Sequence, residues 1–298
     1  MLLTRREALS LAATIRGTGE LPRVPFGPHK ISRLIVGGNP VSGNSHLNAE
    51  ADREMLDYFT AANIKQLLRS CEGAGINTWQ SRGDRHILRL LREYRQEGGR
   101  IEWIAQTATE IRFDRNLPEM VAARPLGIYH HGSNTDRAWQ AGKMEEVRDA
   151  LKAIRQSGVR VGLGTHIPEV IDYVESKGWD VDFHMTCLFN LSRTEEEKQR
   201  LAGEKIRGEL FWDPDRIEML KRVRQASKQC LIFKVYGASR HCDSREKMLN
   251  ALKLAFQYAK PADAIVIGMF PKLTDQVTQN RELFLEAEKG DRRIFPAA

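Results

Sequence analysis

Short apolar runs alternate eight times with longer amphipathic runs along this chain, and this alternation constrains the fold more than any other feature. The clearest of these runs, 264–267, is continuously apolar, as a strand buried on both faces requires. The expected strands are 31–36, 76–80, 101–107, 126–130, 159–163, 181–189, 230–236 and 264–268. Eight strands in series, with helices between them, predict an α/β protein that is a single (β/α)8 TIM barrel.

The amphipathic runs predict the helices that cover this barrel. They are expected at 52–72, 84–96, 118–123, 143–156, 168–177, 213–227, 244–259 and 274–288. An open, doubly wound sheet is the main alternative, and it is disfavoured because no G-x-G-x-x-G motif follows the first strand. The connection 191–212 is long and charged, which favours a lid or binding loop that contains a short surface helix.

The length of 298 residues exceeds the roughly 250 residues of a typical barrel only by short additions at the two ends. We expect the barrel over 22–290, opened by a short N-terminal hairpin, with a separate N-terminal segment over 1–21 and a tail over 291–298.

The N-terminal segment around Arg5 and Arg6 resembles a degenerate twin-arginine export signal of the bacterial type. A short helix is the alternative, because Thr4 and Glu7 fit a capping box. A cytoplasmic location is favoured, since the apolar stretch is short and no cleavage site follows it.

The chain carries a net charge of +7, and no apolar run reaches the about 18 residues needed to cross a bilayer. Basic residues mostly alternate with acidic ones on the expected helix faces, so neither a nucleic-acid surface nor a membrane partner is indicated. The positive excess favours a small anionic molecule as ligand. The four cysteines lack CxxC spacing, which argues against a zinc cage. The oligomeric state stays open.

Histidines follow three consecutive expected strands: His130 and His131, then His166, then His184. Because the carboxyl ends of barrel strands surround one mouth, we expect these side chains to converge. His131 or His166 could act as a general acid or base. His131, His166 and His184 together could hold a divalent metal ion, although each could equally be a hydrogen-bonded structural residue.

Lys234 stands inside an otherwise apolar expected strand. A buried lysine with a depressed pKa can serve as a base or as a Schiff-base nucleophile. The favoured interpretation is a structural ion pair with Glu102 or Asp182 across the barrel interior.

Five segments, taken in order, resemble motifs of the aldo-keto reductases. They are 25–38 (PFGPHKISRLIVGG), 71–77 (CEGAGIN), 162–166 (GLGTH), 188–190 (LFN) and 267–280 (IGMFPKLTDQVTQN). The resemblance covers about residues 22–289 and implies a barrel that binds NADP or NAD. It also implies transfer of a hydride to or from a carbonyl or sugar-like alcohol.

The catalytic groups of that family are an Asp, a Tyr, a Lys and a His at the ends of strands two to four. The resemblance places the histidine at His131, whereas Gln80 stands at the Asp position and Gln106 near the Lys position. No Tyr follows the second strand. The candidate catalytic residues are therefore His131, His166, Gln80 and Gln106, in a divergent member that lacks most of the tetrad.

The resemblance also implies a cofactor site, since the loops after strands seven and eight of a barrel commonly bind phosphate. The candidate cofactor-binding residues are Thr165, Thr186, Asn190, Ser239, Arg240, Gly268, Met269, Lys272, Gln276 and Asn280.

Three functions remain open from the sequence. The first is an oxidoreductase that uses NAD(P)(H). The second is a non-redox lyase, isomerase or hydrolase acting on a polyol or sugar through the histidines, with or without a divalent metal. The third is a barrel that binds a ligand without catalysis.

Overall fold

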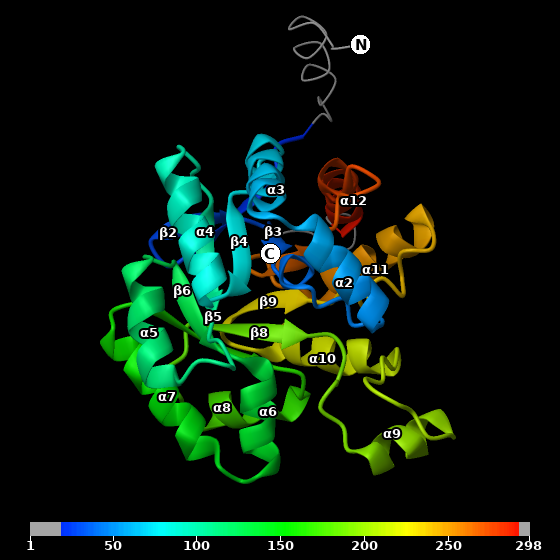
Figure 1. Cartoon of the computed structure of the whole chain (residues 1–298). Coiled ribbons are helices and arrows are strands. Elements are labelled where there is room, and N and C mark those ends of the chain that lie inside the picture. The colour runs from blue at the N-terminus through cyan, green and yellow to red at the C-terminus, as the bar shows by residue number, and fades with distance from the viewer. Residues whose placement is uncertain (1–18, 292–298) are drawn as a thin grey trace, which may run out of the picture.

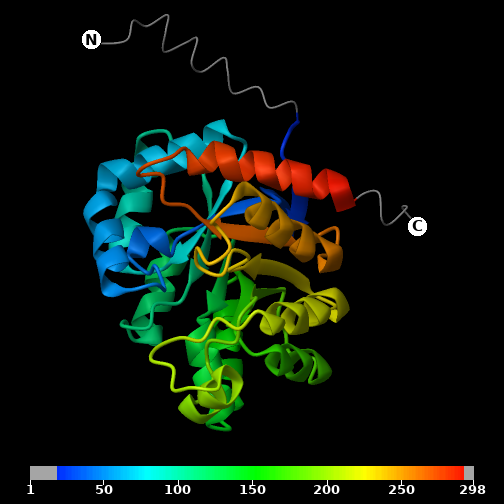
Figure 2. The same cartoon turned by 90° about the vertical axis from the view of Figure 1, so that its right-hand side faces the viewer.

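Eight parallel strands close into a barrel in the computed structural model, which describes residues 19–291, so the expected fold class is confirmed. The strands follow one another around the barrel in chain order, and the last strand pairs with the first (Figures 1 and 2). Their bounds are β3 (Leu34–Gly37), β4 (Thr78–Arg82), β5 (Glu102–Gln106), β6 (Gly127–His130), β7 (Arg160–Thr165), β8 (Phe183–Cys187), β9 (Gln229–Phe233) and β10 (Ala264–Gly268).

A two-stranded antiparallel hairpin precedes the barrel, as expected. It consists of β1 (Arg23–Phe26) and β2 (His29–Ser32), and Gly27 adopts the left-handed conformation in the turn, with a φ of 62°. Phe26 is fully buried, and its ring packs edge-on against Phe183 with 5.0 Å between the centroids. The hairpin therefore contributes to the apolar cluster inside the amino-terminal end of the barrel.

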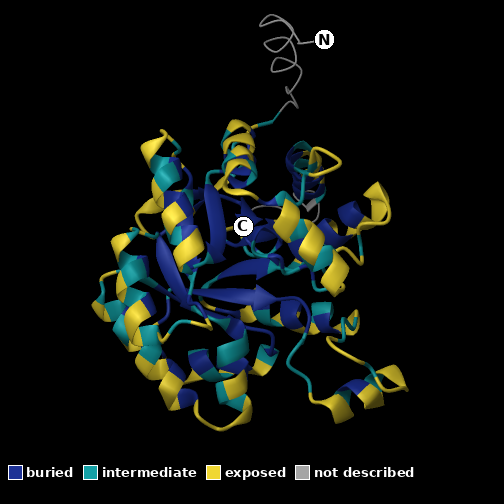
Figure 3. Ribbon diagram, in the orientation of Figure 1, coloured by how far each residue is buried: buried dark blue, intermediate teal, exposed yellow. Residues whose placement is uncertain are grey.

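Helices cover the outside of the barrel, with buried inner faces and exposed outer faces (Figure 3). Their bounds are α2 (Ala49–Tyr58), α3 (Ala61–Gly73), α4 (Arg85–Gln96), α5 (Phe113–Ala122), α6 (Gly132–Gln140), α7 (Met144–Gln156), α8 (Pro168–Ser176), α9 (Glu195–Ala202), α10 (Pro214–Gln225), α11 (Arg245–Tyr258) and α12 (Gln276–Asp291), with a 3-10 turn η1 (Pro40–Ser42). In α4 the buried residues Ile87, Leu90, Leu91 and Tyr94 recur at the helical spacing. Such stripes attach the helices to the sheet.

Several boundaries differ from the sequence-based expectation. The expected strand 31–36 is divided between the hairpin and the barrel. The expected helix 52–72 is two helices, because Thr60 accepts the backbone N–H of Asn63 at 3.3 Å and caps a new helix start. The helix at 132–140 was not expected, since its sequence has too few apolar residues for a periodic pattern.

Additional elements lie at the carboxyl end of the barrel strands, where they surround the mouth. The connection 191–212 contains the expected short surface helix, α9, which projects away from the barrel in Figure 1. Thr194 and Glu197 form a capping box that starts this helix. An ion pair between Arg193 and Asp215 fastens the connection to the start of α10.

The candidate export signal at Arg5 and Arg6 lies outside the described residues. Within 19–291, every helix is too short or too polar to traverse a lipid bilayer.

Candidate active site

A cavity of about 600 Å³ opens at the carboxyl ends of the barrel strands. At one side it is lined by Gln80 of β4 and by His131, and at another by Asn280 of α12. All four candidate catalytic residues border this space, since Gln106 and His166 also line it. The barrel topology thus brings together side chains that are far apart in the sequence.

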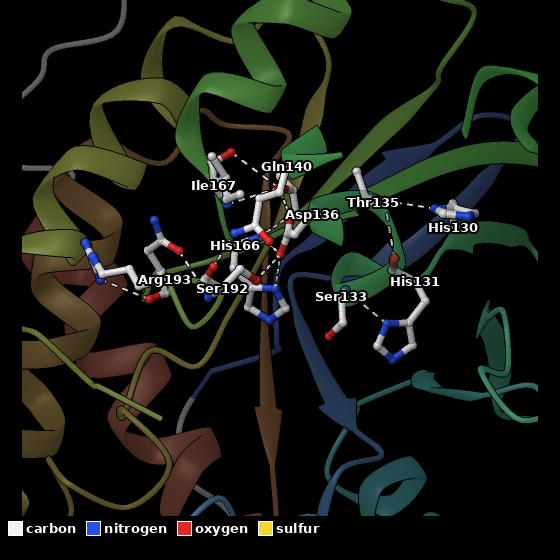
Figure 4. A network of polar contacts seen from close by, with 12 residues as sticks. His130, His131, Ser133, Thr135, Asp136, Gln140, His166, Ile167, Ser192 and Arg193 are labelled. Carbon is white, nitrogen blue, oxygen red and sulfur yellow. Dashed lines mark hydrogen bonds and ion pairs between the residues drawn. The ribbon is translucent and has the colours of Figure 1, made fainter. Parts of the chain in front are cut away.

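His131 caps the N-terminus of α6. Its Nδ1 accepts the backbone N–H of Ser133 at 3.1 Å, so a neutral ring carries its proton on Nε2 (Figure 4). Burial, together with the nearby positive charges of His166 and Arg82, lowers the pKa of His131 to about 4. At neutral pH His131 is therefore an uncharged imidazole with one N–H free to donate.

His166 is held by the buried carboxylate of Asp136, whose Oδ2 lies 2.6 Å from Nδ1 (Figure 4). The same carboxylate accepts hydrogen bonds from the hydroxyls of Thr165 and Ser192, each at 2.6 Å. Burial disfavours the imidazolium, but interactions with Cys187 and Asp136 outweigh it and raise the pKa of His166 to about 10. His166 is thus positively charged at neutral pH.

The two histidine side chains extend to the same side in Figure 4, from neighbouring strand ends. Gly132 lies close to the ring of His166, because a Cβ at this position would lie 3.2 Å from Cε1 of His166. The site combines the neutral N–H donor of His131 with the protonated imidazole of His166, so the two histidines have opposite protonation states.

Tyr129 is a site residue that the sequence analysis missed. Its hydroxyl accepts a hydrogen bond from Nε2 of Gln80 at 2.7 Å, and both side chains line the cavity. Burial raises the pKa of Tyr129, so the phenol stays protonated. Tyr129 and His131 are two residues apart, and the alternation of side chains along β6 could have indicated that they share a face.

Lys234 does not form the expected pair with Glu102 or Asp182. Strand β9 ends at Phe233, and Lys234 follows in the left-handed conformation, with a φ of 60°. Its side chain lines the cavity, with Nζ 2.7 Å from Nε2 of His46. The expectation is wrong because it assumed that the strand continues to residue 236.

His46 and Glu209 were also missed by the sequence analysis. Nδ1 of His46 lies 2.7 Å from Oε2 of Glu209, and both side chains line the cavity. They come from irregular connections, one after β3 and the other after α9. Neither connection has a periodic pattern that could have indicated where its side chains point.

The expected convergence of three histidines requires a correction. His184 occupies the outward-facing alternate position of β8, where it is fully buried with Nε2 3.1 Å from Oε1 of Glu175 in α8. His130 is likewise outside the cavity, with Nδ1 2.8 Å from the hydroxyl of Thr135. Among the described residues, no group of three His, Cys, Asp or Glu side chains is arranged to hold a metal ion.

The candidate cofactor residues fall into two sets. The first set lines the cavity and consists of Ser239, Gly268, Gln276 and Asn280. The second set does not line it and consists of Thr165, Thr186, Asn190, Arg240, Met269 and Lys272. In the second set, Lys272 pairs with Glu54 at 2.7 Å, and Arg240 stacks on the ring of Phe211 at 3.8 Å.

Two features near the first set leave polar groups available to a ligand. Gly237, Ala238 and Ser239 have φ values of 58°, 50° and 72°, and the N–H groups of Ala238 and Ser239 donate to no other described residue. Oδ1 of Asn280 is buried and has no hydrogen-bond partner in the described part of the chain. Consecutive free N–H groups favour an anion, and an unpaired buried amide oxygen requires a donor.

No protein-family model matches the chain, and no curated protein sequence matches it either. Solved structures, in contrast, do match the chain. An aldo-keto reductase from Bacillus halodurans, in its holo form, is 12% identical, with a TM-score of 0.54 over 94% of this chain and 97% of that one. A glycerol dehydrogenase from Gluconobacter oxydans is 12% identical, with a TM-score of 0.52 and the same coverage.

A truncated 3-deoxy-D-arabino-heptulosonate 7-phosphate synthase from Thermotoga maritima is equally similar. It is 13% identical, with a TM-score of 0.53 over 94% of this chain and 95% of that one. Barrels of different activity therefore match this chain equally well, and at this identity the likeness establishes the fold alone. The chain is a (β/α)8 barrel of the architecture that aldo-keto reductases share with other barrel enzymes.

Proposed function

We propose that this chain is an oxidoreductase that binds NADP(H) or NAD(H) and acts on a carbonyl or sugar-like alcohol at the barrel mouth. The observation that carries the proposal is the continuity of one cavity from Gln80 and His131 to Asn280. A dinucleotide needs a long site with polar groups at both ends, and this cavity has them.

The residues at the Asn280 end fit a dinucleotide. The N–H groups of Ala238 and Ser239 would hold a phosphate, and Oδ1 of Asn280 would accept a hydrogen bond from the exocyclic amine of the adenine. Gly268 lines the same cavity, and the absence of a side chain there lets Pro40 pack against it, because a Cβ would lie 2.8 Å from Cδ of Pro40. When bound, the nicotinamide would supply a hydride.

His131 and His166 take the place of the missing Tyr and Lys. The N–H of His131 would donate a hydrogen bond to the carbonyl oxygen and hold it in the cavity. The imidazolium of His166 would stabilise the developing alkoxide and give it a proton. Because the pKa of His166 is about 10, this group keeps its proton until a strong base forms beside it.

A titration of the intrinsic or nicotinamide fluorescence with NADPH and with NADH tests the proposal. We expect saturable binding of at least one nucleotide, and weaker binding by Asn280→Leu, in which the amide oxygen is lost. Asn63→Leu, at a partly buried position on α3 outside the cavity, is the control and should bind like the parent protein. Absence of binding up to millimolar concentrations of both nucleotides would overturn the proposal.

A second function is favoured by the opposite protonation states of His131 and His166. Two titratable groups whose pKa values are driven apart form an acid–base pair, which suits proton transfer on a polyol or sugar without a redox step. Conversion of such a substrate by protein freed of nucleotide would support this function against the first one.

A further inference from the structure

Lys234, His46 and Glu209 form a continuous hydrogen-bonded row at one wall of the cavity. Nζ of Lys234 is 2.7 Å from Nε2 of His46, and Nδ1 of His46 is 2.7 Å from Oε2 of Glu209. An amine, an imidazole and a carboxylate in this order are a nucleophile, a base and the group that orients the base.

The directions of these hydrogen bonds make His46 a proton acceptor toward the lysine. The carboxylate of Glu209 can only accept, so Nδ1 of His46 carries the proton and Nε2 carries the lone pair. The amide nitrogen of Asn39, which can only donate, lies 3.2 Å from the same Nε2. The imidazole is therefore held in the tautomer that can take a proton from Nζ.

The surroundings of Lys234 favour the uncharged amine. The side chain forms no ion pair with any described carboxylate, since Glu209 pairs with His46. Burial and the positive charge of Arg240 lower the pKa of Lys234, against the opposing effects of Cys187 and Glu209. A partly buried lysine kept only for stability would normally have a direct carboxylate partner.

The backbone conformation is a second indication that the side chains of Lys234 and His46 have a function. Lys234 and His46 both adopt the left-handed conformation, with φ values of 60° and 58°, although neither is glycine. Such strain persists where the surrounding structure holds a side chain in a required place.

We propose that Lys234 is a nucleophile that forms an iminium with the aldehyde or ketone group of a small hydroxylated substrate, with His46 as its base. The lone pair of Nζ attacks the carbonyl carbon, and the C=O π electrons move to oxygen as the C–N bond forms. His46 takes a proton from the nitrogen and gives it to the alkoxide, which becomes the hydroxyl of a carbinolamine. His46 then takes up one further proton from solvent water and donates it to this hydroxyl, which leaves as water while the nitrogen lone pair closes the C=N bond.

This activity requires no nicotinamide, so it goes beyond the proposed oxidoreductase function and does not depend on it. Either one can fail while the other stands, because Lys234 and His46 are not the residues that would bind the nucleotide phosphate or protonate an alkoxide.

Reductive trapping tests the inference. The full-length protein, without added nucleotide, is incubated separately with glycolaldehyde and with dihydroxyacetone in the presence of sodium cyanoborohydride, and the adduct is located by peptide mass spectrometry. We expect one adduct per chain, formed on Lys234 faster than on any exposed lysine. His46→Asn should slow labelling of Lys234 by at least about tenfold, since the base is lost.

Lys234→Met and Lys234→Arg should both lose this fast adduct, and the arginine variant retains a cation if the methionine variant does not fold. Lys253→Met removes an exposed lysine from α11 and should label like the parent protein. Slow labelling spread over the exposed lysines, or a fast adduct that survives in Lys234→Arg, would overturn the inference.

Discussion

The two ends of the barrel are built in opposite ways. The amino-terminal end is filled with apolar side chains such as Phe26 and Phe183, whereas the carboxyl end holds an open cavity with His131, His166 and Lys234. Of the five described non-glycine residues with positive φ, four lie at the carboxyl end, namely His46, Lys234, Ala238 and Ser239. Most of the strained backbone of the described residues, and the open cavity, therefore lie at the end opposite the apolar cluster around Phe26.

The largest expected effect is on activity at the mouth. His131→Asn removes the imidazole, but its side-chain oxygen can still cap α6, so we expect a loss of about 10²–10⁴-fold in kcat/KM with little change in stability. The substrate is found by screening carbonyl compounds with NADPH and NADH. His86→Asn, at an exposed position on α4, is the control. Unchanged kcat/KM in His131→Asn would remove His131 from the catalytic groups.

At the amino-terminal end we expect the opposite result, a loss of stability with little change in nucleotide binding. Phe26→Ala empties the space against Phe183 and should lower the free energy of unfolding by about 3–5 kcal/mol. Urea unfolding measures this loss, and nucleotide binding at the mouth should keep its Kd at temperatures where the variant is folded. If Phe26→Ala were as stable as the parent protein but bound nucleotide poorly, stability and binding would not be separated between the two ends.

Stability should also depend on pH through the histidines at the carboxyl ends of β6 and β7. Burial lowers the pKa of His130 and of His131 to about 4, so between pH 6.5 and pH 4 the unfolded chain binds more protons than the folded one. Their contribution to stability is therefore lost as the pH falls through this window. The pKa of His166 is raised to about 10, so its protonation stabilises the folded chain at low pH. This contribution to stability is lost as the pH rises from 6.5 toward 10.

Urea unfolding at pH 5 and at pH 7 measures this dependence. The parent protein should be less stable at pH 5, and His131→Asn should show a smaller difference between the two pH values. An equal difference in both proteins would mean that His131 is not the buried neutral group described above.

The smallest effect is expected at the rim of the mouth. Lys272→Ala breaks a pair with Glu54 that is about half exposed, so stability should change by less than about 1 kcal/mol. We expect binding of NADPH to weaken about fivefold, with NADH unaffected, since a released Lys272 can reach a 2′-phosphate. Lys253→Ala is the matched control, and an equal loss for both nucleotides would remove Lys272 from the cofactor site.

The fold could be predicted because the residues that are buried recur at regular spacing in the sequence. Runs such as 264–267 are apolar throughout, and the apolar faces of the helices repeat at 3.6 residues. The site could be predicted only where it belongs to this regular framework, as with Gln80 and His131, which follow directly from strand ends.

The rest of the site depends on contacts that carry no periodic signal. His46 and Glu209 come from connections whose path is set by packing across the mouth, and Lys234 leaves its strand one residue after it ends. The pairing of His166 with Asp136 depends on α6, a helix whose sequence is too polar to be recognised.

The connection that carries α9 links both halves of the mouth. The hydroxyl of Ser192, at its beginning, bonds to the carboxylate that holds His166, and Glu209, near its end, holds His46. If this one segment swings outward to admit a molecule, both imidazoles lose a supporting contact in the same movement. The orientation of His166 and that of His46 would then change together, because both depend on contacts made by this one connection.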